Sequence, residues 1–307
     1  MILSIGEILV DIFVDGENKT VFPGGAPFNL AANIAYFNKD AVTFLGSVGD
    51  DDNGHFLHEV ALKGIKHPYI SFNKERHTSE AIVTLCDGER SFRFNRDNGC
   101  DYILDINELK KIDLSSLNIV HIGSLMLSYQ EGRQFFYDAI KYIKENSNAL
   151  ISFDVNYRDD IFASEEEAKE IFINALKEAD IIKFTEDELE LLSGEKDLLK
   201  GLKTLLNDNQ VAVITLGKEG SVYYDKNKYI KVATFPMVPV DTTGAGDAFY
   251  SYFLYSFDKG FDKEDDEDIK NTLVRANIVG GFATQKKGAI GVVPSLEEIE
   301  EFLAKHQ

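Results

Sequence analysis

Residues 241–247 read DTTGAGD, and residues 248–255 continue as AFYSYFLY. The second string would be apolar on almost every side of a helix, which predicts a deeply buried helix. The glycine-rich string is then the turn that leads into it. Gly244 and Gly246 have no Cβ, so a ligand can come close to their backbone. Free N–H groups and the dipole at a helix N-terminus favour a bound anion. The stretch therefore predicts an anion site at the start of a buried helix.

Asp247 lies in the first turn of that helix, beside the amides of the predicted anion site. A carboxylate in this position would repel a bound phosphate. The arrangement is useful when the carboxylate accepts a proton from a hydroxyl while the amides hold the growing charge of a phosphoryl group. The structural alternative is that Asp247 only complements the helix dipole. The seven-residue string as a whole favours phosphoryl transfer.

Outward from this stretch, the chain alternates between apolar strand-like runs and helical patterns. We expect strands at 2–10, 41–48, 118–124, 149–155, 180–184 and 211–216. Helices are expected between them, at 27–38, 53–63, 131–145, 165–179 and 198–207. Short strands that are almost wholly apolar are typical of a parallel sheet buried on both faces. The predicted fold class is therefore α/β, with helices on both faces of a mostly parallel central sheet.

Two segments break the alternation. Residues 14–22 are short, polar and rich in turn formers, and residues 79–95 read as a hairpin around Asp87-Gly88. An Asp-Gly pair between two strand-like runs is a strong hairpin signal. We interpret the two segments, at about 12–23 and 79–98, as a small β lid. This lid is a discontinuous second unit inserted in a domain that spans residues 1–307.

The composition limits the partners. The 307 residues carry 32 basic and 52 acidic side chains, a net charge of −20, which argues against nucleic acid and anionic membranes as partners. No run approaches the 18 apolar residues of a membrane span. Two cysteines, Cys86 and Cys100, form no disulfide framework and indicate a reducing, cytoplasmic location. The first residues lack a basic segment and read as a core strand instead of a signal peptide.

At this point the sequence resembles a known family. The DTTGAGD string matches the C-terminal signature of the PfkB, or ribokinase-like, carbohydrate kinases. Their N-terminal signature matches GGAPFNLAAN at 24–33 and FLGSVGDDDNG at 44–54. The resemblance covers essentially the whole chain and implies a ribokinase-like αβα sandwich with a β lid. Within the family, fructokinases are most similar, through the strings at 89–96, 121–125, 153–158 and 180–188.

The resemblance implies an ATP-dependent sugar kinase that converts ATP and D-fructose to D-fructose 6-phosphate and ADP. Asp247 matches the catalytic base, and Gly244, Ala245 and Gly246 match the anion hole. Arg158 would follow the fourth strand, where its planar guanidinium suits the transferring phosphate. The alternative for Arg158 is a salt bridge to Asp154, Asp159 or Asp160.

The sugar-binding residues implied by the resemblance are Asp11, Gly25, Asn29 and Arg96. Asp11 is expected at the carboxyl end of the first strand, where ligand crevices open in such sheets. Gly25 lets the sugar approach the backbone, and the Asn29 amide can both donate and accept hydrogen bonds. For Arg96 the alternative is an exposed charge on the lid. The sugar should lie between the sheet edge and the lid.

The resemblance also implies a nucleotide site on the carboxyl side of the sheet, built from Lys183, Glu188, Thr215, Gly217, Gly220 and Asn277. Glu188 belongs to the family's N-x-x-E motif, which supports Mg²⁺ indirectly through the phosphates. Here Thr185 replaces the asparagine. Many relatives are activated by K⁺, and the matching positions of that monovalent-cation site are Asp241, Thr243, Ala283 and Gly288. ATP, Mg²⁺ and K⁺ are thus the implied co-substrate and ions.

Three other functions stay open. Within the family, the substrate could be 2-keto-3-deoxygluconate or ribose. A non-catalytic sugar or nucleotide sensor is a second class, which the intact Asp247 disfavours. A dinucleotide oxidoreductase is a third, disfavoured because no G-x-G-x-x-G follows the first strand, and the P-loop motif is absent too. Exposed lid strands tend to pair, so we also predict a homodimer through the lid.

Overall fold

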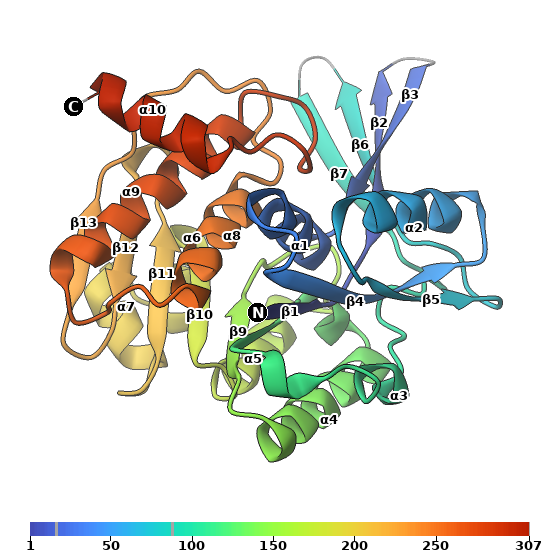
Figure 1. Cartoon of the computed structure of the whole chain (residues 1–307). Coiled ribbons are helices and arrows are strands. Elements are labelled where there is room, and N and C mark those ends of the chain that lie inside the picture. The colour runs from blue at the N-terminus through green and yellow to red at the C-terminus, as the bar shows by residue number, and fades with distance from the viewer. Residues whose placement is uncertain (16–17, 87–88, 307) are drawn as a thin grey trace.

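The computed structural model describes residues 1–15, 18–86 and 89–306. Within these residues the main sheet has nine strands in the order β13-β12-β11-β10-β9-β8-β1-β4-β5 (Figure 1). All neighbouring strands from β11 to β5 run parallel, and the edge strands β12 and β13 are antiparallel. In chain order the strands are β1 Ile2–Ile5, β4 Val42–Gly49, β5 Tyr69–Asn73, β8 Ile119–Ile122, β9 Leu150–Asp154, β10 Ile181–Thr185, β11 Val211–Thr215, β12 Ser221–Tyr224 and β13 Tyr229–Val232.

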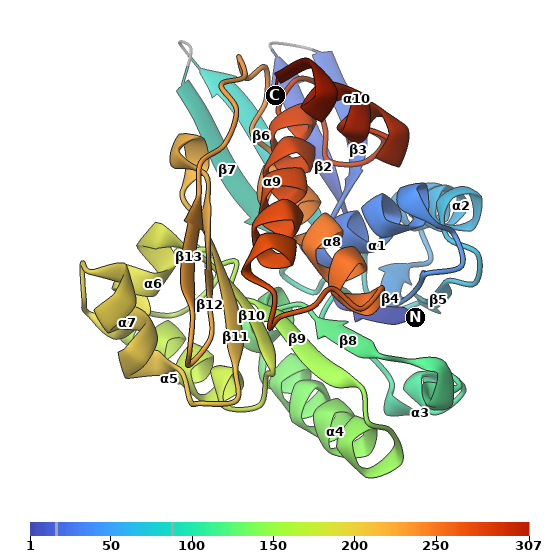
Figure 2. The ribbon, with the colours of Figure 1, turned by 60° about the vertical axis from the view of Figure 1, so that its left-hand side comes forward.

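Helices cover both faces of this sheet, as Figures 1 and 2 show. One face carries α1 Ala26–Phe37, α2 Asp52–Gly64, α8 Ala245–Asp258, α9 Asp266–Ala283 and α10 Leu296–His306. The other carries α3 Ile106–Leu109, α4 Gln130–Asn146, α5 Glu165–Leu176, α6 Glu186–Ser193 and α7 Leu198–Leu205. Each face has its own apolar core. The α/β sandwich predicted from the sequence is confirmed.

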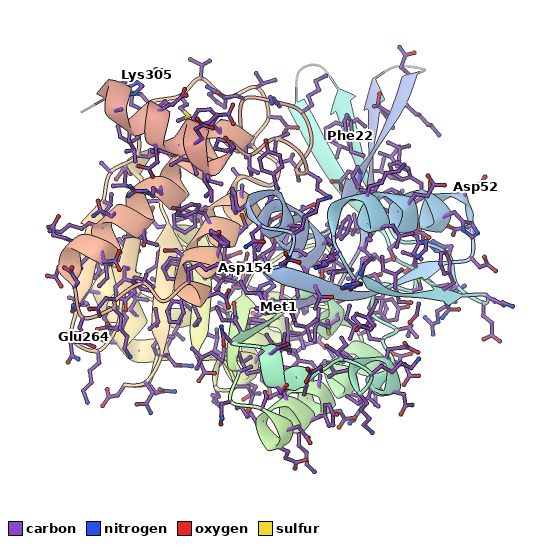
Figure 3. The ribbon with its side chains drawn as sticks, viewed as in Figure 1. Met1, Phe22, Asp52, Asp154, Glu264 and Lys305 are labelled. Carbon is purple, nitrogen blue, oxygen red and sulfur yellow. The ribbon has the colours of Figure 1, made fainter. Side chains whose placement is uncertain are left out.

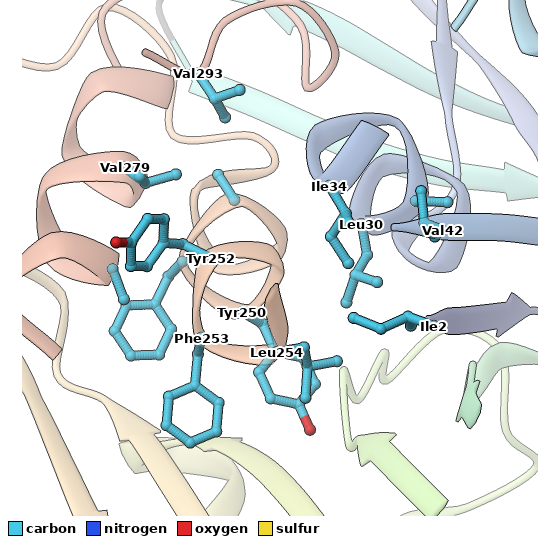
Figure 4. Close-up of a cluster of buried hydrophobic side chains, with 14 of the residues drawn as sticks. Ile2, Leu30, Ile34, Val42, Tyr250, Tyr252, Phe253, Leu254, Val279 and Val293 are labelled. Carbon is cyan, nitrogen blue, oxygen red and sulfur yellow. The ribbon is translucent and has the colours of Figure 1, made fainter. Parts of the chain in front are cut away.

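The helix α8 lies inside the first of these cores. Figure 4 shows Tyr250, Phe253 and Leu254 of α8 between the side chains of α9 and those of α1. The helices α8 and α9 also lie side by side in Figures 1 and 2. Residues 248–254 of α8 are all buried, as the apolar string predicted. Because a helix held on all sides cannot shift easily, its first turn is a rigid place for a site.

A second, four-stranded sheet rises from the carboxyl edge of the main sheet (Figure 1). Its order is β3-β2-β6-β7, from β2 Leu9–Asp15, β3 Asn18–Gly24, β6 Glu80–Cys86 and β7 Glu89–Asn95. The central pair β2 and β6 is parallel and the outer pairs are antiparallel. These strands coincide with the segments interpreted as a lid. The Asp87-Gly88 turn lies outside the described residues, so only its flanking strands can be compared.

The apolar run at 2–10 is not one strand, which corrects the prediction. The chain leaves the main sheet after Ile5 and enters the small sheet at Leu9. At the break, Gly6 has a φ of 149° and the Glu7 carboxyl accepts a hydrogen bond from the Ala26 N–H. Periodicity could not reveal the break, because residues 8–10 are as apolar and as buried as residues 2–5. Both sheets share the same core.

The remaining predicted elements agree with the structure to within a few residues. No residue range was predicted for the short strands β5, β12 and β13 or for the helices α3, α6, α9 and α10. Most of these are edge strands or short helices whose patterns are weak. Within the described residues no helix combines the length and apolar character that a membrane span requires.

Candidate active site

A cavity of about 90 Å³ lies where the main sheet, the small sheet and the N-terminal ends of α1 and α8 meet. It is rich in carboxyl and amide groups. Its lining residues are Glu7, Leu9, Asp11, Gly25, Ala26, Asn29, Ala81, Phe94, Leu125, Asn156, Arg158, Thr243, Gly244 and Asp247. The structure therefore brings together residues that are up to 240 positions apart in the sequence, from Glu7 to Asp247.

The glycine-rich turn forms one wall of the cavity. Gly244 precedes α8 with a φ of 74°, a conformation that side chains disfavour. A Cβ at Gly244 would also come within 2.4 Å of the Ala289 Cβ. Residues Ala245 and Gly246 then open the helix, where the first N–H groups have no intrahelical acceptor. The predicted turn and helix start are both present, and Thr243, Gly244 and Asp247 line the cavity.

Asp247 is held by an asparagine from another helix. The Asn29 Nδ2 of α1 donates a hydrogen bond to the Asp247 Oδ2 at 2.8 Å. Burial raises the pKa of Asp247 to about 6, although the Asn29 hydrogen bond, Lys183 and Arg158 favour its charged form. The Asn29 Oδ1 is buried and has no hydrogen-bond partner within the described residues. The carboxylate is thus mostly ionised near pH 7, and a free acceptor lies beside it.

Asp11 reaches the same cavity, but from a different strand than predicted. It is the third residue of β2 in the small sheet and does not end a strand of the main sheet. It is 8% exposed. Burial and the charges of Asp247 and Asp241 raise the pKa of Asp11 to about 7, and Arg158 opposes them. A second carboxyl of the cavity therefore titrates close to neutral pH.

Gly25 allows the close contact between the first loop and α1. It is the N-terminal cap of α1, with a φ of 104°. A Cβ at this position would lie 2.4 Å from the Glu7 carbonyl oxygen. Gly25 and the following Ala26 line the cavity, so backbone groups are available to a ligand there.

Arg96 is buried behind the cavity and does not line it. Only 3% of it is exposed, so the alternative of an exposed lid charge is wrong. Its guanidinium donates to Asp101 at 2.9 and 2.6 Å, to the Ser128 Oγ and to the Leu125 carbonyl. Leu125 in turn lines the cavity. A direct sugar contact by Arg96 stays a prediction. Within the described residues Arg96 is connected to the cavity wall through its hydrogen bond to the Leu125 carbonyl.

Arg158 and Lys183 are the two cations whose charges favour the ionised form of Asp247. Arg158 is exposed at the mouth of the cavity. Its predicted alternative partner, Asp154, is instead paired with Lys183 at 2.8 Å in the interior of the molecule, where Figure 3 labels Asp154. Burial disfavours the Lys183 ammonium, but the Asp154 charge outweighs it and raises the pKa of Lys183. The space beside Gly246 ends at this ammonium, 3.5 Å from where a Cβ would be.

The motif around Glu188 explains the replacement of asparagine by Thr185. The Thr185 hydroxyl accepts a hydrogen bond from the Glu188 N–H at 3.2 Å, and the Glu188 Oε2 accepts one from the Thr185 N–H at 2.7 Å. This is a capping box at the start of α6. The Glu188 Oε1 accepts a third bond, from the Tyr157 N–H. Glu188 thus ties the loop after β9, which carries Arg158, to the end of β10.

The other predicted nucleotide residues lie further along the carboxyl edge and outside the cavity. Thr215 ends β11, and a single turn of 3₁₀-helix, η3 Gly217–Glu219, separates it from Gly220. Gly217 and Gly220 have φ values of 56° and 103°. Asn277 is buried in α9, and its Nδ2 has no hydrogen-bond partner within the described residues. Thr215, Gly217 and Gly220 thus lie at the end of β11 and just after it, whereas Asn277 lies within α9.

The predicted monovalent-cation residues also come together. The Asp241 Oδ1 accepts hydrogen bonds from the Thr243 hydroxyl and N–H at 2.8 and 3.1 Å. Its Oδ2 accepts one from the Gly288 N–H at 3.4 Å, and the Asp241 N–H donates to the carbonyl of Thr284, the residue after Ala283. Asp241 is 2% exposed. Its carboxylate and the neighbouring carbonyls are oxygen ligands, the type that hard cations prefer.

Comparisons with known proteins agree with this geometry. A sequence profile described as pfkB family carbohydrate kinase matches residues 1–296. The chain belongs to the pfkB family of carbohydrate kinases. A curated relative, a probable fructokinase-2 from Arabidopsis thaliana, is 36% identical over 99% of this chain and 95% of its own length.

Solved structures show the same relationship. A double mutant of the fructokinase from Vibrio cholerae O395, solved with fructose, ADP and potassium ion, has a TM-score of 0.88 at 30% identity and covers 98% of this chain and 97% of its own. The fructokinase from Xylella fastidiosa with bound ATP has a TM-score of 0.91 at 27% identity and covers 99% of this chain and 98% of its own. The resemblance seen in the sequence signatures is confirmed.

Sequence reasoning missed several residues that line the cavity of this pfkB family member. They are Glu7, Leu9, Ala26, Ala81, Phe94, Leu125 and Asn156. Asn156 lies two residues after β9 with a φ of 40°, and a polar residue at that edge was a usable signal. Glu7 was hidden in a run that looked like one strand. It is the only acidic residue among 2–10, and that exception to an apolar run could have singled it out.

Proposed function

We propose that this chain is an ATP-dependent fructokinase that transfers the γ-phosphoryl group of ATP to D-fructose. The observation that carries the proposal is the position of the Asp247 carboxylate. It lies in one small cavity with the start of α8, Asp11 and Arg158. A base beside an anion-binding helix start is the arrangement that phosphoryl transfer requires. The fructokinases from two bacteria that share this fold support the choice of sugar.

In the proposed reaction, the 6-hydroxyl oxygen of fructose attacks the γ-phosphorus. The new bond is O–P, and the bond that breaks joins the phosphorus to the oxygen bridging to ADP, which leaves with the electron pair. Asp247 accepts the hydroxyl proton. Because its pKa is about 6, it is mostly ionised at pH 7 and ready to do so. The amides of 244–246 and the Arg158 guanidinium would stabilise the phosphoryl oxygens.

The residues present fit the two implied ions differently. The buried Asp241 carboxylate, with the carbonyls near Thr243, Ala283 and Gly288, suits a monovalent cation, which would add positive charge beside the anion site. Within the described residues no group of three or more His, Cys, Asp or Glu could hold a metal. Mg²⁺ would therefore be held mainly by the nucleotide and water. Glu188, with both oxygens bound to N–H groups, would support it only indirectly.

The small sheet is proposed to act as a lid. It supplies Leu9, Asp11, Ala81 and Phe94 to the cavity wall. Closing it over the sugar would exclude water and limit wasteful hydrolysis of ATP. Its outer strands β3 and β7 are edge strands. Exposed edge strands tend to pair with other chains, and this tendency supports the proposed homodimer. Cys100 is a buried free thiol, as expected for the proposed cytoplasmic location.

The decisive experiment measures ADP release with Mg-ATP and KCl across fructose, glucose, mannose, ribose, 2-keto-3-deoxygluconate and adenosine. Fructose should give the highest kcat/KM. Preference for 2-keto-3-deoxygluconate or ribose would keep Asp247 as the base and replace the substrate. If no sugar is turned over yet fructose binds in calorimetry, the sensor becomes the better description.

A variant test separates enzyme from sensor more directly. Asp247→Asn keeps an oxygen that can accept the Asn29 hydrogen bond but cannot take a proton. It should lower kcat about 10²- to 10⁴-fold while fructose binding, measured by calorimetry, stays within a few-fold of the wild type. Full turnover in this variant would refute the assignment of the base.

A further inference from the structure

The cavity contains a third carboxyl, Glu7, that the reaction described above does not use. Glu7 is 1% exposed and lies at the break between β1 and β2. Its Oε1 accepts a hydrogen bond from the Ala26 N–H at 3.1 Å. Its Oε2 is buried and has no hydrogen-bond partner within the described residues. Buried oxygens without a partner are rare and call for a ligand or another explanation.

The absence of a side chain at Gly123 leaves room for the Glu7 carboxyl. A Cβ at Gly123, which follows β8, would come within 2.8 Å of the Glu7 Oε2. Arg96, whose charge acts on Glu7, is already bound to Asp101, and Glu7 has no ion-pair partner within the described residues. The charged groups that face it are Arg96, Asp101 and Asp247, and Asp11 shares the cavity. Three of these four are acidic, which makes a charge on Glu7 costly.

We propose that Glu7 is a sugar-binding residue that keeps its proton and donates the Oε2–H to a sugar oxygen, while the Oε1 stays fixed on the Ala26 N–H. Asp247, and Asp11 above about pH 7, are ionised and can only accept hydrogen bonds from the sugar. A hydroxyl that donates to one of them still has lone pairs, and the protonated Glu7 supplies a donor for them. The inference rests on the proposed sugar kinase function and adds a specificity residue to it.

Electrostatics point the same way as the geometry. Burial raises the pKa of Glu7 to about 8, Asp101 and Asp247 add to the effect, and Arg96 and a backbone hydrogen bond oppose it. The carboxyl is therefore mostly neutral at pH 7, and it loses its proton as the pH passes about 8. Above that pH it would become an acceptor beside two carboxylates, and sugar affinity should fall.

The test compares Glu7→Gln with Glu7→Met. Glutamine keeps an oxygen for the Ala26 N–H and offers an amide donor in place of the O–H, so it mimics the protonated acid. Methionine keeps the length and loses both groups. Glu7→Met should raise the KM for fructose about 3- to 10-fold, as expected for one neutral hydrogen bond, with a smaller change in kcat. Glu7→Gln should stay within about threefold of the wild-type KM.

Ser4→Ala is the matched control. The Ser4 hydroxyl donates to the Pro27 carbonyl at 2.8 Å, so it holds the same start of α1 without lining the cavity. It should leave the KM unchanged. A raised KM in Ser4→Ala equal to that of Glu7→Met would show that only the placement of α1 matters and would overturn the proposal. An increase in KM in Glu7→Gln as large as that in Glu7→Met would also overturn the proposal, because the ionised carboxylate would then be needed.

A pH series keeps the proposal testable if Glu7→Met fails to fold. Fructose affinity of the wild type, measured by calorimetry without ATP, should fall as the pH rises from 7 to 9. Glu7→Gln should not show that fall, and an identical fall in both proteins would overturn the proposal. The wild type is first assayed over the sugar panel, and the best substrate is used for the variants. A wrong choice of fructose then appears in the wild type, and a wrong role for Glu7 appears in the variants.

Discussion

The hydrogen bond between Asn29 and Asp247 should set the pH at which the enzyme becomes active. Asn29→Leu removes the Nδ2 donor, 2.8 Å from the Asp247 Oδ2, with little change in volume. Asn29 is buried and Asp247 is only partly exposed, so water replaces the lost donor poorly. A hydrogen bond to a charged group contributes about 1.5–3 kcal/mol. At 1.36 kcal/mol per pH unit this loss raises the pKa of Asp247 by about 1–2 units.

The assay is kcat/KM for fructose between pH 5 and 9, since this ratio reports the pKa values of the free enzyme. The wild type should lose activity below about pH 6, where Asp247 becomes protonated. In Asn29→Leu the same loss should begin near pH 7 to 8. The KM will also rise if Asn29 binds the sugar, but that change alone moves the whole curve down without shifting it along the pH axis.

The control is Asn33→Leu, the same substitution one turn further along α1. The Asn33 Nδ2 is 3.5 Å from the Ala289 carbonyl, and Asn33 makes no hydrogen bond to Asp247 within the described residues. Its acid limb should stay near pH 6. If the limb of Asn29→Leu shifts by less than about 0.3 units, or if both variants shift equally, the contact does not hold the pKa of the base and the reasoning is wrong.

Four further outcomes are expected. Lys183→Met should lower the free energy of unfolding in urea by about 3–5 kcal/mol, because it leaves Asp154 buried without its partner, and adding Asp154→Leu should restore most of it. Gly25→Ala, with φ at 104°, should cost at least about 2 kcal/mol. Asp241→Asn should raise the KCl concentration for half-maximal activity at least about tenfold, and an unchanged response would exclude Asp241 as a cation ligand. The pKa of Glu7 is about 8 in the folded state, against an ordinary 4.5, so the fold has its full stability below about pH 4.5 and loses part of it as the pH rises through 8. Glutamine does not titrate, so the free energy of unfolding of Glu7→Gln should rise relative to that of the wild type by up to about 5 kcal/mol between pH 4.5 and 9.

The sequence predicted the parts of the site that depend on consecutive residues. The DTTGAGD turn needs Gly244 at a positive φ and an apolar helix after it, and both features are written in one stretch of residues. The alternation of strands and helices follows from periodicity in the same way. These local requirements explain why the fold class and the start of α8 could be predicted.

Features that depend on three-dimensional neighbours could not be predicted. The break after Ile5 was marked only by Gly6 and Glu7, because the apolar residues on both sides of it are buried in the same core. Arg96 looked like a lid residue in the sequence, yet Asp101, only five positions away, draws it into the interior. The pairing of Lys183 with Asp154 joins adjacent parallel strands, and its register appears only once the strand order is known.

The three carboxyls of the cavity illustrate how one environment can give similar groups different tasks. Glu7 and Asp11 are buried and Asp247 is only partly exposed, so loss of hydration favours the neutral form of each carboxyl. Asp247 receives the Asn29 donor and has the lowest pKa, about 6, whereas Asp11 lies near Arg158 and titrates at about 7. Glu7 has no ion pair within the described residues and titrates at about 8. At pH 7 the base is therefore ready to accept a proton while Glu7 still holds one, and the Asn29 hydrogen bond, which a single substitution can remove, contributes to that difference together with the charges of Lys183 and Arg158.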